Sequence, residues 1–277
     1  MIGLSSSYFA SKGFGIYDSV KKCSDLGFKL VELGAAHRFE KDVFETLRKI
    51  KTDFSHMSFT AHALFPPLEK PLWFNIAEGL TTQNKGVLLN LFHAASVIEA
   101  KPVGIHPGYL EEPISGEDYF GFNIPKKGKE IGKENALLNS HKLIKFALNL
   151  SEEYYVPFCI ENIDSTALTP IYSSQKDFRE LFELFPSLGF LFDLGHAQIE
   201  ENVEQMLEFS SKIKEVHLHE SKSSTEIHFP LSQKNPFLQK LKSIPEIKKI
   251  PLIFEHPSFV KEEEILKEKE LVERTLF

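Results

Sequence analysis

The sequence is poor in cysteine, in long apolar runs and in glycine-rich nucleotide-binding motifs. Its two cysteines, Cys23 and Cys159, have no C-x-x-C spacing and are too few for a disulfide framework, so we expect reduced thiols and a cytoplasmic protein. No stretch approaches the roughly 18–20 apolar residues of a membrane-spanning helix. The opening MIGLSSSYF also lacks the basic segment of a signal peptide. We therefore expect no membrane among the partners.

Excess positive charge is missing as well. The formal net charge is -7 and the sequence pI is about 5.9. The overall basic footprint that is usual in nucleic-acid-binding proteins is therefore absent, although a local basic groove stays possible. The 277 residues, of which 42% are hydrophobic, can form one large core or two small ones. Because neither a low-complexity linker nor a composition shift marks a boundary, we predict a single domain over residues 1–277.

Short apolar runs alternate with segments of helical spacing along the whole chain. The predicted strands are Ile2–Ser7, Phe28–Leu33, Met57–Ala63, Pro102–His106, Pro157–Glu161, Gly189–Asp193, Ile213–Leu218 and Pro251–Glu255. The predicted helices are Ile16–Leu26, Lys41–Thr52, Lys85–Glu99, Glu134–Glu153, Gln175–Phe185, Val203–Ser211, Pro236–Ser243 and Lys261–Arg274. Eight strand–helix units predict an α/β protein with a closed (β/α)8 TIM barrel. An open doubly wound sheet is the alternative, but no G-x-G-x-x-G follows the first strand.

The longest connections all follow strands. They are Leu64–Asn84, Pro107–Gly132 and His219–Asn235, whereas the connections from a helix to the next strand are short. In a barrel of parallel strands, the loops that follow the strands lie on the carboxyl face, where active sites are found. We therefore expect the functional site on that face.

Metal-binding residue types recur at the ends of the predicted strands. The stretch Leu188–Ile199 ends a buried strand in Asp193 and presents His196 three residues later. This D-x-x-H could bind a metal ion, or Asp193 could cap the next helix. Six of the eight predicted strands end in or near His, Asp or Glu: His62, His106, Glu161, Asp193 (followed by His196), His217 and Glu255.

Carboxylates that converge at the mouth of a barrel repel one another unless a cation lies between them. A mixed set of nitrogen and oxygen ligands without thiolate suits Zn or Mn. The loop STEIHFPLS adds Glu226 and His228, which share one face if the backbone is extended and could complete a second or third metal position. The alternative to the metal site is a polar barrel mouth that binds no metal. For Glu226 and His228, the alternative is that they are two exposed polar residues on the loop.

Together these motifs resemble the xylose isomerase-like TIM barrels, which include endonuclease IV and many sugar isomerases and epimerases. The similarity runs from the first strand to the last and is carried by HPG at His106, IEN at Glu161, D-x-x-H at Asp193, HLHES at His217, E-x-H at Glu226 and FEHP at Glu255. The resemblance implies core metal ligands at Glu161, Asp193, His217 and Glu255. It implies additional ligands, as in the three-zinc endonuclease IV type, at His62, His106, His196, Glu226 and His228.

The chain departs from the family pattern in the loop after the seventh strand. Glu226-Ile227-His228 stands where D-x-H is usual, and the following PLSQKN contains no glycine. His219-Glu220-Ser221-Lys222 stands where the endonucleases have N-D-S-K. These departures leave open whether a third ion is bound, so the resemblance implies one to three divalent ions, Zn or Mn.

The preferred function is a metal-dependent isomerase or epimerase of a sugar or sugar phosphate. In it Glu161 and Glu255 move a proton at the carbon next to a carbonyl, and His196 is a further catalytic candidate. Phe65, Trp73 and Tyr109 could form the apolar wall of the pocket. His219, Lys222 and Arg38 could contact polar or phosphate groups. Each of these six can also be an ordinary packing or surface residue.

The alternative function is an endonuclease IV-like zinc phosphodiesterase that acts on abasic DNA. The extra histidines favour it, since two or three zinc ions could activate a hydroxide near Glu161. The acidic composition weighs against it, and only Arg38, Phe65 and Trp73 are candidates for DNA contacts. A barrel that binds metal without catalysis is a third possibility.

Overall fold

Eight parallel strands close into a barrel in this computed structural model, which describes residues 1–70, 72–119, 122–221 and 228–277 and, within these, the side chains outside 116–119 and 122–124. The barrel strands are β1 (Ile2–Ser5), β2 (Leu30–Leu33), β3 (Ser58–His62), β4 (Val103–Ile105), β7 (Phe158–Glu161), β8 (Gly189–Asp193), β9 (Ile213–Leu218) and β10 (Leu252–Phe254). Their order around the barrel is β1-β10-β9-β8-β7-β4-β3-β2, and every neighbouring pair is parallel. The predicted TIM barrel is therefore confirmed.

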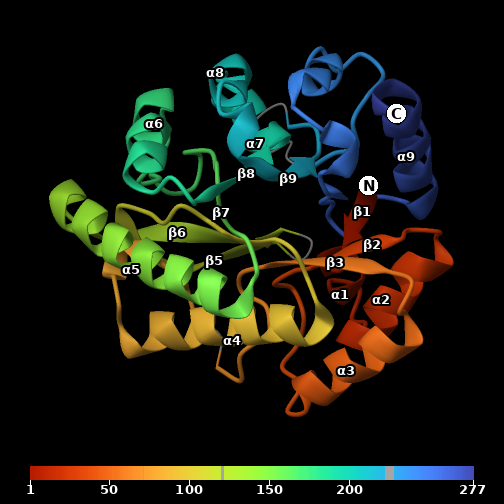
Figure 1. The fold of residues 1–277 in the computed structure, drawn as a ribbon, viewed down its shortest axis with the longest axis horizontal. Coiled ribbons are helices and arrows are strands. Elements are labelled where there is room, and N and C mark those ends of the chain that lie inside the picture. The colour runs from red at the N-terminus through yellow and green to blue at the C-terminus, as the bar shows by residue number, and fades with distance from the viewer. Residues whose placement is uncertain (71, 120–121, 222–227) are drawn as a thin grey trace.

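Helices surround the strands (Figure 1). The longer ones are α2 (Ile16–Asp25), α3 (Val43–Asp53), α4 (Thr82–Ile98), α5 (Lys133–Tyr154), α6 (Gln175–Leu184) and α9 (Glu262–Leu276). Local sequence explains where they start: the Thr81 hydroxyl accepts from the Asn84 amide before α4, and Ser174 and Asp177 form a capping box before α6. Each of these six lies within a few residues of its predicted bounds.

Five parts of the chain differ from the sequence prediction. The long connection after β4 contains an antiparallel hairpin, β5 (Glu111–Tyr119) and β6 (Phe122–Glu130). A short helix α7 (Leu194–Ile199) follows β8 directly, and another, α1 (Ser7–Ala10), follows β1. The helix predicted at Val203–Ser211 is split into α8 (Val203–Leu207) and a 3-10 turn, η2 (Ser210–Lys212), whereas Pro236–Ser243 forms the 3-10 helix η3 (Leu238–Ser243). The remaining 3-10 turns are η1 (Ile76–Glu78) and η4 (Ile247–Lys249).

The core has two layers. Fully buried aromatic side chains such as Phe158, Phe190 and Phe254 belong to the main apolar cluster together with residues of the helices. Inside the barrel, Gly104 lets neighbouring side chains approach, since a Cβ there would lie 2.5 Å from Cδ1 of Leu191 and 3.1 Å from Cδ2 of His62. The barrel is thus a packed interior whose open end is the carboxyl edge of the strands.

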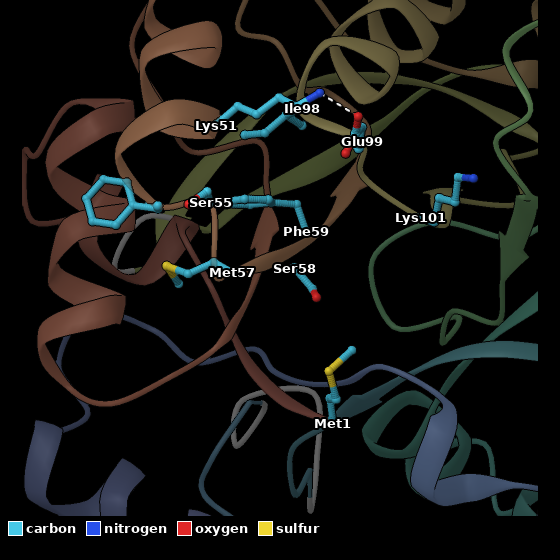
Figure 2. A pocket seen from close by; sticks show the side chains of 10 residues that line it. Met1, Lys51, Ser55, Met57, Ser58, Phe59, Ile98, Glu99 and Lys101 are labelled. Atoms are coloured by element: carbon cyan, nitrogen blue, oxygen red, sulfur yellow. Dashed lines mark hydrogen bonds and ion pairs between the residues drawn. The ribbon is translucent and has the colours of Figure 1, made fainter.

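A cavity of about 520 Å³ lies at the other end of the barrel (Figure 2). It is lined by the ends of α3 and α4, the start of β3 and Met1, and an ion pair between Lys51 and Glu99 lies at its edge. Of the site residues that the sequence nominated, none that the structure describes lines this cavity. Among the helices that the structure describes, none is long and apolar enough to cross a membrane.

Candidate functional site

Three predicted carboxylate ligands converge on a ring nitrogen of a fourth ligand at the carboxyl end of the barrel. The Nδ1 atom of His217 lies 3.3 Å from Oε1 of Glu161, 3.6 Å from Oδ2 of Asp193 and 3.4 Å from Oε2 of Glu255. These residues come from the ends of β7, β8 and β9 and from the residue just after β10. The structure therefore brings together side chains that lie far apart in the sequence.

The orientation of the His217 ring decides what this convergence can do. Its Nε2 atom lies 2.8 Å from Oε2 of Glu32, so in the neutral ring an Nε2–H donates to that carboxylate and Nδ1 keeps a lone pair. Nδ1 is buried and has no hydrogen-bond partner in the part of the chain that the structure describes. A lone pair and three carboxylates that face one point make a donor set for a divalent cation, and the chemistry of these residues fits one.

Without a cation, the imidazoles carry the compensating charge. Burial would raise the pKa of Glu161, but the His217 and His62 imidazoles outweigh it and hold this pKa well below its usual value. Burial would lower the pKa of His217, whereas Glu32 and Glu161 raise it well above its usual value. The carboxylates are therefore ionised at neutral pH, as metal ligands and general bases must be.

A second group of possible ligands shares Glu161. His62, at the end of β3, has Nε2 2.7 Å from Oε2 of Glu161, and its Nδ1–H donates to the Ala63 carbonyl at 2.8 Å. Nε2 of His106 lies 3.5 Å from the same carboxylate oxygen, and its Nδ1 lies 3.1 Å from the Tyr109 hydroxyl. Each imidazole thus has one nitrogen held by a partner and the other directed to Glu161, which is the usual arrangement of histidine ligands.

A third group consists of three histidines: His196, His219 and His228. Nδ1 of His196 lies 2.6 Å from Oδ2 of Asp164, and Nε2 of His219 lies 2.9 Å from Oδ2 of Asp193. The rings of His219 and His228 are stacked at 3.9 Å. The backbone of His228 is left-handed (φ 57°), so this residue is held in a strained conformation at the site.

His219 differs from its sequence-based assignment. We expected it to contact substrate, whereas the structure groups its ring with two predicted metal ligands. Asp193 also caps α7, since its Oδ1 accepts from the His196 amide at 2.7 Å, so the capping role and a place in the ligand set coexist. Lys222 and Glu226, two further predicted site residues, lie outside the described residues.

Sequence reasoning missed three residues that orient this site. Asp164 holds the His196 ring, and Asn162 clamps Asp193, because its amide donates to the Asp193 carbonyl and accepts from the Asp193 amide, both at 2.8 Å. The third is Glu32 on β2, whose carboxylate holds the His217 ring. Asn162 and Asp164 directly follow Glu161 in the IENID stretch, so their place next to a strand end was the only signal available.

A cavity of about 620 Å³ lies over these groups. Trp73 and Tyr109 line it as expected, together with Leu64, Leu72 and Phe74. Phe65 does not, because it is 1% exposed and packs against His37, and the exposed Arg38 is not among the lining residues either. The charged side chains among the described lining residues, apart from histidines, are the acids Glu32, Asp164 and Glu255. The cavity has the size of a small-molecule site.

The family model described as "Xylose isomerase-like TIM barrel" matches residues 20–272 of the chain. An uncharacterized protein of Methanocaldococcus jannaschii is 28% identical over 139 residues, which are 50% of this chain and 47% of that protein. The matched part thus spans about half the length of this curated relative.

Solved structures share the fold at low sequence identity. A D-tagatose 3-epimerase-like protein has a TM-score of 0.70 at 19% identity, with 99% of this chain and 96% of that chain covered. A D-psicose 3-epimerase, solved in the presence of D-fructose, has a TM-score of 0.72 at 13% identity, with 99% of each chain covered.

Proposed function

We propose that this chain, which belongs to the xylose isomerase-like TIM barrel family, is a divalent-metal-dependent sugar isomerase or epimerase. The observation that carries the proposal is the convergence of Glu161, Asp193 and Glu255 on the unpartnered Nδ1 of His217, at the mouth of a barrel. Such a centre, below a cavity for a small molecule, suits proton transfer next to a carbonyl. The fold neighbours named as 3-epimerases of sugars favour the same class.

A bound divalent ion would supply electrophilic polarisation of the carbonyl and hydroxyl oxygens of the sugar. Glu161 and Glu255 supply the acid–base chemistry in this proposal. They come from β7 and from the end of β10, and each approaches the His217 ring nitrogen from its own strand, at 3.3 Å and 3.4 Å. A substrate carbon between the two carboxylates loses a proton to one of them, and it regains a proton from the other once that carboxylate has taken one up from water.

Both of these acids are ionised at neutral pH. Burial would raise the pKa of Glu255, but its contact with His217 lowers it to about 2, so this side chain is a carboxylate before substrate binds. Trp73, Phe74 and Leu72 form an apolar wall of the cavity, which limits water at the reacting carbon and packs against the C–H face of a sugar.

Isotope exchange tests this function. The metal-loaded protein is incubated in D2O with a panel of free ketoses and ketose phosphates, and deuterium at the carbon next to the carbonyl is followed by NMR. We expect exchange with at least one of them, and a decrease of about 10²–10⁴-fold in Glu161→Gln. His56→Gln, a change of an exposed histidine, is the control. Absence of exchange across the panel, or full exchange in Glu161→Gln, contradicts the proposal.

The second candidate is a zinc phosphodiesterase that acts on abasic DNA. The flanking groups favour it, because His62 and His106 share Glu161, and His196, His219 and His228 could hold a further ion. A duplex with one abasic site is incubated with the zinc-loaded protein and, as a control, with chelator. Chelator-sensitive nicking that Glu161→Ala abolishes would establish this activity in place of the isomerase.

A further inference from the structure

We propose that the barrel interior holds a separate site for a hard divalent cation, bound through oxygen atoms of Glu215, Glu32, Thr60 and Ser5, below the predicted metal ligands of the mouth. This site differs from the three groups described above. Its distinguishing residue is Glu215 on β9, a fully buried acid that the proposed reaction does not use.

The topology brings these four side chains to the barrel interior. Glu215 and His217 are two residues apart on β9, so both point to the same face of the strand. Glu32 reaches His217, and it is the register partner of Ser5 on β1 and of Thr60 on β3. Register partners on adjacent strands share a face, so Ser5 and Thr60 point inward beside Glu32. Ligand atoms of Glu32, Glu215 and His217 lie within 4.8 Å of one another.

Most of the oxygen atoms in this interior row have no partner. Both carboxylate oxygens of Glu215, the Thr60 hydroxyl and the Ser5 hydroxyl are buried and have no well-formed hydrogen bond to any residue that the structure describes. The Thr60 hydroxyl nevertheless faces the Glu215 carboxylate. Buried polar groups in proteins are almost always satisfied, so unsatisfied oxygens next to a pair of acids indicate a bound species.

The charged groups around Glu215 indicate what kind of species would bind there. The groups whose charges act on Glu215 are Glu32, of like sign, and the imidazoles of His217 and His62. Glu215 is fully buried, and ligand atoms of Glu32 and Glu215 lie within 4.8 Å of each other. Two buried acids this close together favour a cation between them.

A cation accounts for the unsatisfied oxygens and the two neighbouring acids better than a proton or a water molecule does. One proton on Glu215 would leave its other carboxylate oxygen without a partner, and a water molecule would bring no positive charge to the two acids. A hard divalent cation takes carboxylate and hydroxyl oxygens together and neutralises two acids. Glu32 also lines the mouth cavity, so it connects the interior site with the route of a cation from solvent.

Manganese is the probe for this site. Chelated protein is reloaded with Mn²⁺ and crystallised, and anomalous difference density is measured at the manganese edge. We expect a peak between Glu32 and Glu215, separate from any peak at the mouth. Elemental analysis should give one Mn²⁺ more per chain in the wild type than in Glu215→Gln. Any anomalous peak at the barrel mouth should be retained in this variant.

The proposal is overturned if wild-type crystals show no electron density between Glu32 and Glu215, or density without anomalous signal, as water would give. It is also overturned if the interior anomalous peak is unchanged in Glu215→Gln. If Glu215→Gln does not fold, Thr60→Val removes one oxygen ligand at nearly constant volume and is expected to weaken interior Mn²⁺ binding about 10-fold or more. The wild-type peak requires no variant and no substrate, so this test is independent of the isomerase proposal.

Discussion

Glu32 and His217 meet across the barrel interior, with 2.8 Å between Oε2 of Glu32 and Nε2 of His217. Their strands, β2 and β9, are not neighbours in the barrel, because β1 and β10 lie between them. The contact turns Nδ1 of His217 toward the three carboxylates at the mouth. A residue from the second strand therefore orients the ring on which the candidate metal centre converges.

Glu32→Gln tests this orientation. The amide can still accept a hydrogen bond, but it loses the charge that makes His217 a stronger ligand, so we expect metal affinity at the mouth to fall about 10–100-fold. Competition against a chromogenic chelator measures the change. Glu45→Gln, an exposed glutamate of α3, is the matched control and should bind as the wild type does. Equal affinities in Glu32→Gln and wild type would refute the orienting role.

Gly195→Ala tests the histidine group that contains His219. A Cβ at this position would lie 2.0 Å from Cε1 and Nδ1 of His219, so the ring must leave its place beside Asp193. We expect a lower metal content per chain and a stability loss of about 1–3 kcal/mol from overpacking. Elemental analysis and thermal unfolding provide the two readouts.

Gly86→Ala is the control for that substitution. Gly86 lies within α4, and a Cβ there meets nothing within 4 Å. We expect unchanged metal content and a gain of about 0.5–1 kcal/mol, since alanine favours the helix. If Gly195→Ala retains the full metal content, His219 is not needed for any bound ion.

The buried pair His256–Glu268 should make stability depend on pH. Nε2 of His256 lies 2.6 Å from Oε2 of Glu268 on α9, so His256 faces the helices. Burial would lower the pKa of His256, but Glu268 outweighs it and raises this pKa above the usual value. The stabilisation is therefore fully present below the unfolded pKa of about 6.5 and is lost as pH rises through the folded pKa.

Glu268→Gln reveals this dependence. Breaking the buried pair should cost about 3–5 kcal/mol near pH 6, and the difference from wild type should shrink as the pH rises. Urea unfolding between pH 6 and 9, in the presence of chelator, measures it. A difference that stays constant or grows with pH would show that the pair is neutral in the folded protein.

Metal removal should lower the free energy of unfolding, by an amount that rises with the ratio of free metal to its dissociation constant. An ion present at about 100 times its dissociation constant adds about 2.7 kcal/mol, so chelation of the wild type should lower Tm and added Zn²⁺ or Mn²⁺ should restore it. Asp193→Asn keeps the shape of a ligand but removes its charge, and its Tm should respond much less. An equal response in Asp193→Asn would argue against binding at this centre.

The barrel was predictable because its signals are local. Apolar runs bounded by turn residues marked the strands, and the carboxyl ends of parallel strands meet at one edge, so Glu161, Asp193 and His217 could be grouped without coordinates. Residues that act across the barrel interior or from loops could not be predicted in this way. Asp164 and Asn162 act from irregular backbone, and the β5–β6 hairpin has register shifts that weaken its alternation.

Glu161 belongs to two ligand groups at once, because Oε2 faces His62 and Oε1 faces His217. Two ions bound in these groups would be bridged by a single carboxylate. The first would enter the carboxylate-rich side, and its charge would weaken the attraction for the second. Loading would then be stepwise, and the supply of free metal in the surroundings would determine whether one ion or two are held.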